Sequence, residues 1–75
     1  MSRVPSLKAP EVLRALQRGG FLVHHVKGSH HYLRHPDKPG VQVAIFHHRK
    51  ELPPGTIRRI VRDADLTIEE FLELL

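Results

Sequence analysis

Apolar positions repeat at helical spacing near the start of the chain and again near its end. The first stripe predicts a helix that opens between Ser6 and Pro10 and consists of Ala9, Val12, Leu13 and Leu16. Gly19-Gly20 ends this helix, because glycine adopts the left-handed backbone of many helix C-termini. A second stripe predicts a helix from about Gly55 or Thr56 to Ala64 and consists of Ile57, Ile60, Val61 and Ala64.

Between these helices the apolar residues are branched or aromatic, which is typical of strands. We predict strands at residues 21–27, 30–35 and 41–46. Lys27-Gly28-Ser29 forms the first turn and the proline- and glycine-rich segment 36–40 the second. Short connections between consecutive strands favour an antiparallel meander, and the polar, proline-broken segment 47–55 is predicted to be a loop.

A capping box marks one more element at the end of the chain. Thr67 fits the N-cap and Glu70 the N3 position of a short helix. Its inward-facing residues are predicted to be Ile68, Phe71, Leu72 and Leu75. The whole order, α-β-β-β-α with a short C-terminal helix, predicts an α+β fold with a three-stranded antiparallel sheet and helices on one face. This is the layout of double-stranded-RNA-binding domains, and it leaves the other face of the sheet open.

Composition narrows the class of protein. Seventy-five residues, 40% of them apolar, suffice for one modest core, so we expect residues 1–75 to form a single domain. The absence of cysteine excludes a disulfide framework, a thiolate nucleophile and a cysteine-based zinc site. The longest apolar run is residues 43–46, and residues 1–10 lack the apolar stretch of a signal peptide. We expect a cytoplasmic protein without a membrane partner.

Charge is distributed unevenly along the chain. All twelve Lys and Arg residues lie in residues 1–62 beside only three acids, a net charge of +9. Residues 63–75 hold five acids and no base, a net charge of −5, which leaves +4 for the whole chain. A basic body of this size suits a polyanionic ligand such as nucleic acid.

Seven histidines, all between residues 24 and 48, are the most unusual feature of the composition. They are compatible with ordinary surface positions, with a metal site built from His25, His30 or His35, or with acid–base chemistry. No H-E-x-x-H motif is present, and few carboxylates lie near the histidines, so we expect no metal. RNA carries its own nucleophile, the 2′-OH, so a base and a nearby cation suffice to cleave it without metal or cofactor.

One segment resembles a known family. Lys27-Gly28-Ser29-His30-His31, followed by Arg34-His35-Pro36, is similar to the G-S-H…H-P signature of the HicA toxins, a family of small mRNA interferases. The likeness continues through the Gly19-Gly20-Phe21 turn and through an H-x-x-K-E-L-x-x-G-T-x-x-x-I run from His47 to Ile60. One departure is Ile45, where family members often carry proline. His24, His25, His31 and His48 map to no catalytic position.

The resemblance implies a toxin of a type II toxin–antitoxin pair that cleaves mRNA and is inhibited by a HicB-like antitoxin. It also implies that His30 is catalytic and that no metal or small-molecule cofactor takes part. The single-stranded mRNA substrate and the antitoxin protein are the partners that we expect.

The residues themselves suggest roles around His30. Strand alternation places His30, Tyr32 and Arg34 on one face. We expect His30 to be the general base on the 2′-OH and a basic side chain to stabilise the phosphorane. His47 fits either a second acid–base group or an RNA contact. Ser29 fits a residue that holds the imidazole, a phosphate contact or a turn cap. The substrate-binding candidates are Lys27, Gly28, Ser29, Arg34, His47, Lys50, Arg58, Arg59 and Arg62.

The sequence is also compatible with three other functions. The same fold could bind RNA without cutting it. The basic face could dock an acidic protein only. The histidine cluster could bind a metal. Cleavage by the parent and by a His30 variant in the presence of EDTA separates these classes of function.

Overall fold

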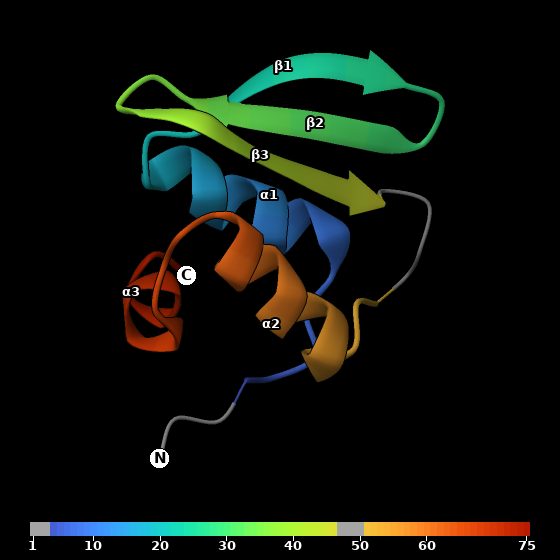
Figure 1. Cartoon of the computed structure of the whole chain (residues 1–75). Helices are drawn as coiled ribbons and strands as arrows, with labels where there is room; N and C mark the ends of the chain where they lie inside the picture. The colour runs from blue at the N-terminus through green and yellow to red at the C-terminus, as the bar shows by residue number, and fades with distance from the viewer. Residues whose placement is uncertain (1–3, 47–50) are drawn as a thin grey trace.

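Among the residues that the structure describes, three strands form one layer and three helices the other. The computed structural model describes residues 4–46 and 51–75 (Figure 1). The elements follow in the order α1 (Ala9–Arg18), β1 (Leu22–Lys27), β2 (His30–His35), β3 (Lys38–Phe46), α2 (Pro54–Asp63) and α3 (Ile68–Glu73). This order and the antiparallel sheet confirm the fold class that the sequence predicts.

The sheet has the strand order β1-β2-β3, as expected for a meander. Its register pairs Lys27 with His30 and His30 with Phe46, so these three residues lie in one row across the strands. The β1–β2 register shifts between Val23 and His25, which makes His24 a bulge residue.

The core lies between the sheet and the helices. Along β3, Val43 and Ile45 are fully buried, whereas Gln42, Ala44 and Phe46 are exposed. Leu33 is the corresponding buried residue of β2. One face of the sheet therefore carries the core, and the other is open, as predicted. The helices contribute most of the remaining buried side chains, among them Val12, Leu16, Ile57, Ile60, Val61 and Phe71. Val4, Phe21 and Leu52 are buried in segments outside the helices and strands.

Strand β3 begins earlier than predicted. We expected a turn over 36–40 and a strand from residue 41, but His35 pairs with Lys38 after a register shift beside Arg34. Pro39 is tolerated because it lies within this register shift of an edge strand, where no paired N–H is lost. At the other edge, β1 begins at Leu22, and Phe21 is buried in the core.

The two C-terminal helices also differ in detail from their predictions. Helix α2 begins at Pro54, because proline fits the first helical position. Helix α3 has the predicted capping box but ends at Glu73, so Leu75 is no longer at a helical position. The prediction that Leu75 faces inward was wrong: it is 44% exposed, and Leu74 packs against the core in its place.

Two backbone hydrogen bonds join the segments that precede α1 and α2. The Leu52 N–H donates to the Leu7 carbonyl at 2.7 Å, and the Leu7 N–H donates to the Leu52 carbonyl at 3.3 Å. Within the part of the chain that the structure describes, no helix is long and apolar enough to cross a membrane.

Candidate functional site

The candidate site begins at the tight turn between β1 and β2. Only Gly28 and Ser29 connect the strands, and Gly28 has a φ of 58°. A positive φ at the first residue of a two-residue hairpin is the pattern of a type II′ turn, which favours glycine there. A Cβ added at Gly28 would meet nothing within 4 Å, so the space above the turn is open to a ligand. This turn brings Lys27 directly opposite His30.

His30 lies in a shallow hollow on the open face of the sheet. The hollow has a volume of about 560 Å³ and is lined by Lys27, Gly28, Ser29, His30, Tyr32 and Phe46. The His30 ring meets Phe46 edge to face, with ring centroids 3.7 Å apart, and is nearly parallel to Tyr32, at 13° and 6.0 Å. Two aromatic neighbours therefore fix where the imidazole lies, while its half-exposed position keeps it within reach of a ligand.

The arrangement combines a proton acceptor and a cation in one hollow. An imidazole takes up and returns a proton near neutral pH. The ammonium of Lys27 supplies positive charge beside it, on the same face of the hairpin. A phosphodiester placed here would meet both groups at once.

Arg34 lies on the same face, further along β2. It lines a second hollow together with His24, His25, Lys27, Tyr32 and Gln42. Lys27 and Tyr32 border both hollows, so the two are neighbours on the open face. Of the sequence-predicted site residues, five are thus brought together here, namely Lys27, Gly28, Ser29, His30 and Arg34.

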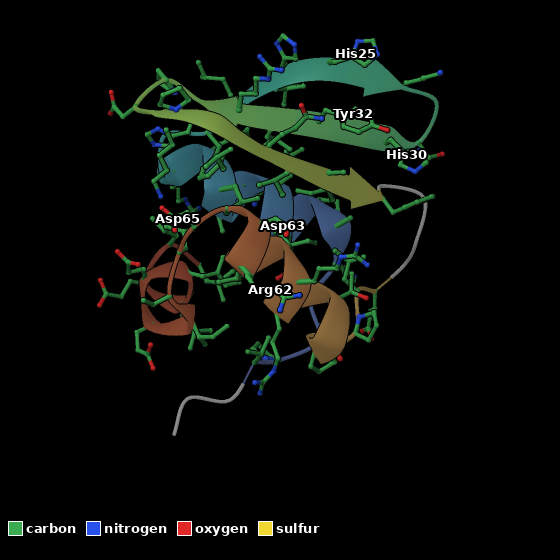
Figure 2. The ribbon with its side chains drawn as sticks, in the orientation of Figure 1. His25, His30, Tyr32, Arg62, Asp63 and Asp65 are labelled. Carbon is green, nitrogen blue, oxygen red and sulfur yellow. The ribbon has the colours of Figure 1, made fainter. Side chains whose placement is uncertain are left out.

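The three arginines of α2 lie in the other layer. Arg58, Arg59 and Arg62 are exposed on the helix, and they line a groove between α2 and α3 with Gly55 and Thr67, among others. Figure 2 shows Arg62 beneath the sheet, whereas His25, Tyr32 and His30 lie on β1 and β2. The structure does not bring these arginines to His30. His47 and Lys50, as well as His48, lie outside the described residues.

The sequence prediction missed the aromatic partners of His30. Tyr32 and Phe46 line its hollow, and the His25 ring lies 5.9 Å from the Tyr32 ring. The alternation of β2 already placed Tyr32 on the His30 face. His25 and Phe46 required the strand register, because the bulge at His24 changes which β1 residues face which way.

His35, the second histidine of the G-S-H…H-P signature, has a structural role. Its Nδ1 accepts the Asp37 N–H at 3.1 Å, so Nε2 carries the proton and donates to the Gly19 carbonyl at 2.9 Å. The ring also meets Phe21 edge to face, at 4.9 Å. His35 thereby joins the end of β2 to the end of α1.

Lys38 makes a similar connection to α2. Its Nζ donates to the carbonyls of Ala64 and Asp65, each at 3.2 Å. These carbonyls follow the last turn of α2, where a cation is favourable. Among the described residues, no three histidine or carboxylate side chains are grouped so that they could hold a metal ion.

Comparison with known proteins identifies the family. A search of curated protein sequences returned no match. A family model described as the HicA toxin of bacterial toxin–antitoxin systems matches residues 9–66. The matched region contains α1, the complete sheet and α2, and thus the turn that carries His30. The chain belongs to the HicA toxin family of bacterial toxin–antitoxin systems.

Proposed function

We propose that this protein is an mRNA interferase, a metal-independent endoribonuclease whose general base is His30. The observation that carries the proposal is the position of His30 beside Lys27 in one open hollow, on a sheet face that none of the described helices covers. None of the residues of β1, β2 and β3 is acidic, so a phosphate chain meets no repulsion from the strands themselves.

The chemistry uses the nucleophile that RNA supplies. His30 takes the proton of a 2′-OH, and the 2′-oxygen forms a bond to the adjacent phosphorus. Lys27 stabilises the extra negative charge of the phosphorane, on the principle of a preorganised cation aimed at developing charge. The bond from phosphorus to the 5′-oxygen then breaks. That oxygen takes a proton from solvent or from the Lys27 ammonium, leaving a 2′,3′-cyclic phosphate and a 5′-hydroxyl.

The antitoxin of the pair is proposed to be a HicB-like protein that covers this hollow. Lys27 and Arg34 lie on the open face, and their positive charge suits an inhibitor that covers this face with acidic side chains. Such an inhibitor would keep RNA from His30 without changing the fold of the toxin. The complex should weaken as salt concentration rises, since exposed charge pairs are screened.

The proposal is tested by cleavage of a labelled single-stranded RNA with EDTA present. We expect the parent to cut, and His30→Ala to lose at least about a hundredfold in rate, the lower end of what a general base contributes. The new ends should carry a 2′,3′-cyclic phosphate. Arg14→Gln, on α1 in the other layer, serves as the control for a lost surface charge.

Other outcomes assign a different function. Undiminished cutting by His30→Ala would exclude His30 as the base. Loss of cutting by EDTA in the parent would mean that a metal takes part. RNA binding without cleavage by the parent would indicate a non-catalytic binding module of the same fold.

A further inference from the structure

A row of four aromatic rings crosses the open face of the sheet. Consecutive centroids are 5.9 Å apart for His25 and Tyr32, 6.0 Å for Tyr32 and His30, and 3.7 Å for His30 and Phe46. The row runs from β1 over β2 to the end of β3, and Figure 2 shows its three labelled members at the same end of the sheet. We call these four side chains the ring row.

The ring row is accessible and does not belong to the core. His25 is exposed, Phe46 is 42% exposed, and Tyr32 and His30 are half-buried. Contiguous exposed rings of this kind are typical of a binding surface. The core does not use it either, because the buried residues of β2 and β3 point to the opposite face.

The orientation of the rings suits flat ligands. Tyr32 and His30 are nearly parallel, at 13°, and His25 is tilted from Tyr32 by only 32°. A planar base that stacks on one of these rings is therefore roughly parallel to the next. The two hollows on either side of Tyr32 leave room above the row.

Positive charge follows the same path. Lys27 borders both hollows, and Arg34 borders the one that contains His25. A line of aromatic side chains with cations along it is how proteins bind single-stranded nucleic acid, with the bases stacked and the phosphates paired. In an RNA duplex the bases are already stacked and paired, so a duplex gains nothing from such a row.

We propose that the ring row binds unpaired RNA bases by stacking, with Tyr32 as its central platform, and so selects single-stranded RNA. The proposal rests on the proposed function in one respect, namely that the ligand is RNA. It adds that the bases on either side of the cleaved bond lie on Tyr32, His25 and Phe46. His30 then has two roles, as one ring of the row and as the base.

The test measures binding to a uniformly 2′-O-methylated RNA, which has no 2′-OH and cannot be cleaved. Affinity is read by fluorescence anisotropy, and stacking by quenching of a fluorescent base analogue within the strand. Tyr32→Leu keeps an apolar side chain of moderate size but removes the ring. We expect it to weaken binding by about 5- to 100-fold and to reduce the quenching.

Matched variants separate stacking from other effects. Tyr32→Phe keeps the ring and should bind like the parent. His25→Leu should weaken binding by several-fold, and its exposed position means that folding is not at risk. Val26→Ala removes exposed apolar surface from β1 beside His31, on the other face of the sheet, and should leave affinity unchanged. Against the same RNA as a duplex, Tyr32→Leu should change affinity by less than about twofold.

Three contrary results would each overturn the inference. Parent-like affinity of both Tyr32→Leu and His25→Leu would show that the rings are not the platform. Equal losses of affinity for the single strand and the duplex in Tyr32→Leu would show a general RNA-binding surface without selection for unpaired bases. If the protein bound neither RNA, but both variants weakened the antitoxin complex, the row would be a protein interface. Cleavage that survives in His30→Ala would refute only the proposed base.

Discussion

At the scale of single residues, His35 shows how a signature histidine can serve the fold. Its Nε2 hydrogen bond to Gly19 and its contact with Phe21 hold the turn after α1 against the end of β2. Gly20 lies beneath the ring with a φ of 98°, and a Cβ there would be 2.6 Å from His35 Nε2. The glycine and the histidine therefore form one tightly packed unit.

The packing of Gly20 under His35 predicts a measurable coupling. Gly20→Ala should destabilise the protein both through its positive φ and because the new methyl group displaces a ring held by two hydrogen bonds. The destabilisation caused by the clash with the ring should disappear in a His35→Ala background. A double-mutant cycle from urea unfolding should give a coupling free energy of about 1 kcal/mol or more.

Gly28 provides the control for this cycle. It also has a positive φ, but a Cβ there would meet nothing within 4 Å. Gly28 lies in the turn before β2 and His35 at the far end of that strand, so the effects of Gly28→Ala and His35→Ala on the unfolding free energy should be additive to within about 0.5 kcal/mol. If the free-energy changes of Gly20→Ala and His35→Ala were equally additive, the contact between Gly20 and the His35 ring would be refuted.

At the scale of elements, α3 depends on its N-terminal hydrogen bonds. The Thr67 N–H donates to Glu70 Oε1 at 2.8 Å, and the Glu70 N–H donates to Thr67 Oγ1 at 3.0 Å. The pKa of the Glu70 carboxyl is held below its ordinary value, chiefly by the hydrogen bond from the Thr67 backbone and next by the hydrogen bond with the Thr67 side chain. The helix is short, so a lost cap affects most of it.

The lowered pKa of Glu70 predicts how stability depends on pH. Because the folded state favours the carboxylate, the contribution of ionised Glu70 to the free energy of unfolding is fully present above the ordinary pKa of 4.5. The contribution is lost as the pH falls through the lower, folded-state pKa. Glu70→Gln keeps an oxygen acceptor but no charge. Its unfolding free energy should therefore be lower than that of the parent near pH 7 and approach the parent value in acid. Glu73→Gln, outside the capping box, is the control, and an unchanged pH profile for Glu70→Gln would contradict the assignment.

Elements defined by local pattern could be predicted from the sequence, and those that depend on partners could not. The capping box of α3 and the stripe of α1 are set by residues within one or two turns. The bulge at His24 and the early start of β3 at Lys38 depend on strand pairing and on bonds between distant residues. For the same reason the sequence could place Lys27 next to His30, since the two are near in the chain, but not Phe46, which only the strand register brings beside them.

At the scale of the molecule, the strands of the sheet carry bases but no acid. The strands contain Lys27, Arg34 and Lys38, whereas the acids of residues 63–75 lie at the end of α2, in the turn after it and on α3, all in the helix layer (Figure 1). A polyanion is therefore drawn to the sheet and repelled from α3. The arginines of α2 occupy a third region, in the groove beside α3. These two basic regions face different sides of the molecule.

This separation predicts that RNA length decides which cations take part in binding. A non-cleavable single strand of about four nucleotides suffices for one binding face, so its affinity should depend on Lys27 and Arg34. For each phosphate contact removed, the slope of log affinity against log salt should fall by about 0.7. Replacing Arg58, Arg59 and Arg62 by Gln should leave that slope unchanged for the short strand. It should lower the slope for a strand several times longer, which can pass around the sheet edge to α2. If the α2 variant weakened the short strand as much as the Lys27 and Arg34 variants do, RNA would bind across the helices, and the open face of the sheet would not be its primary site.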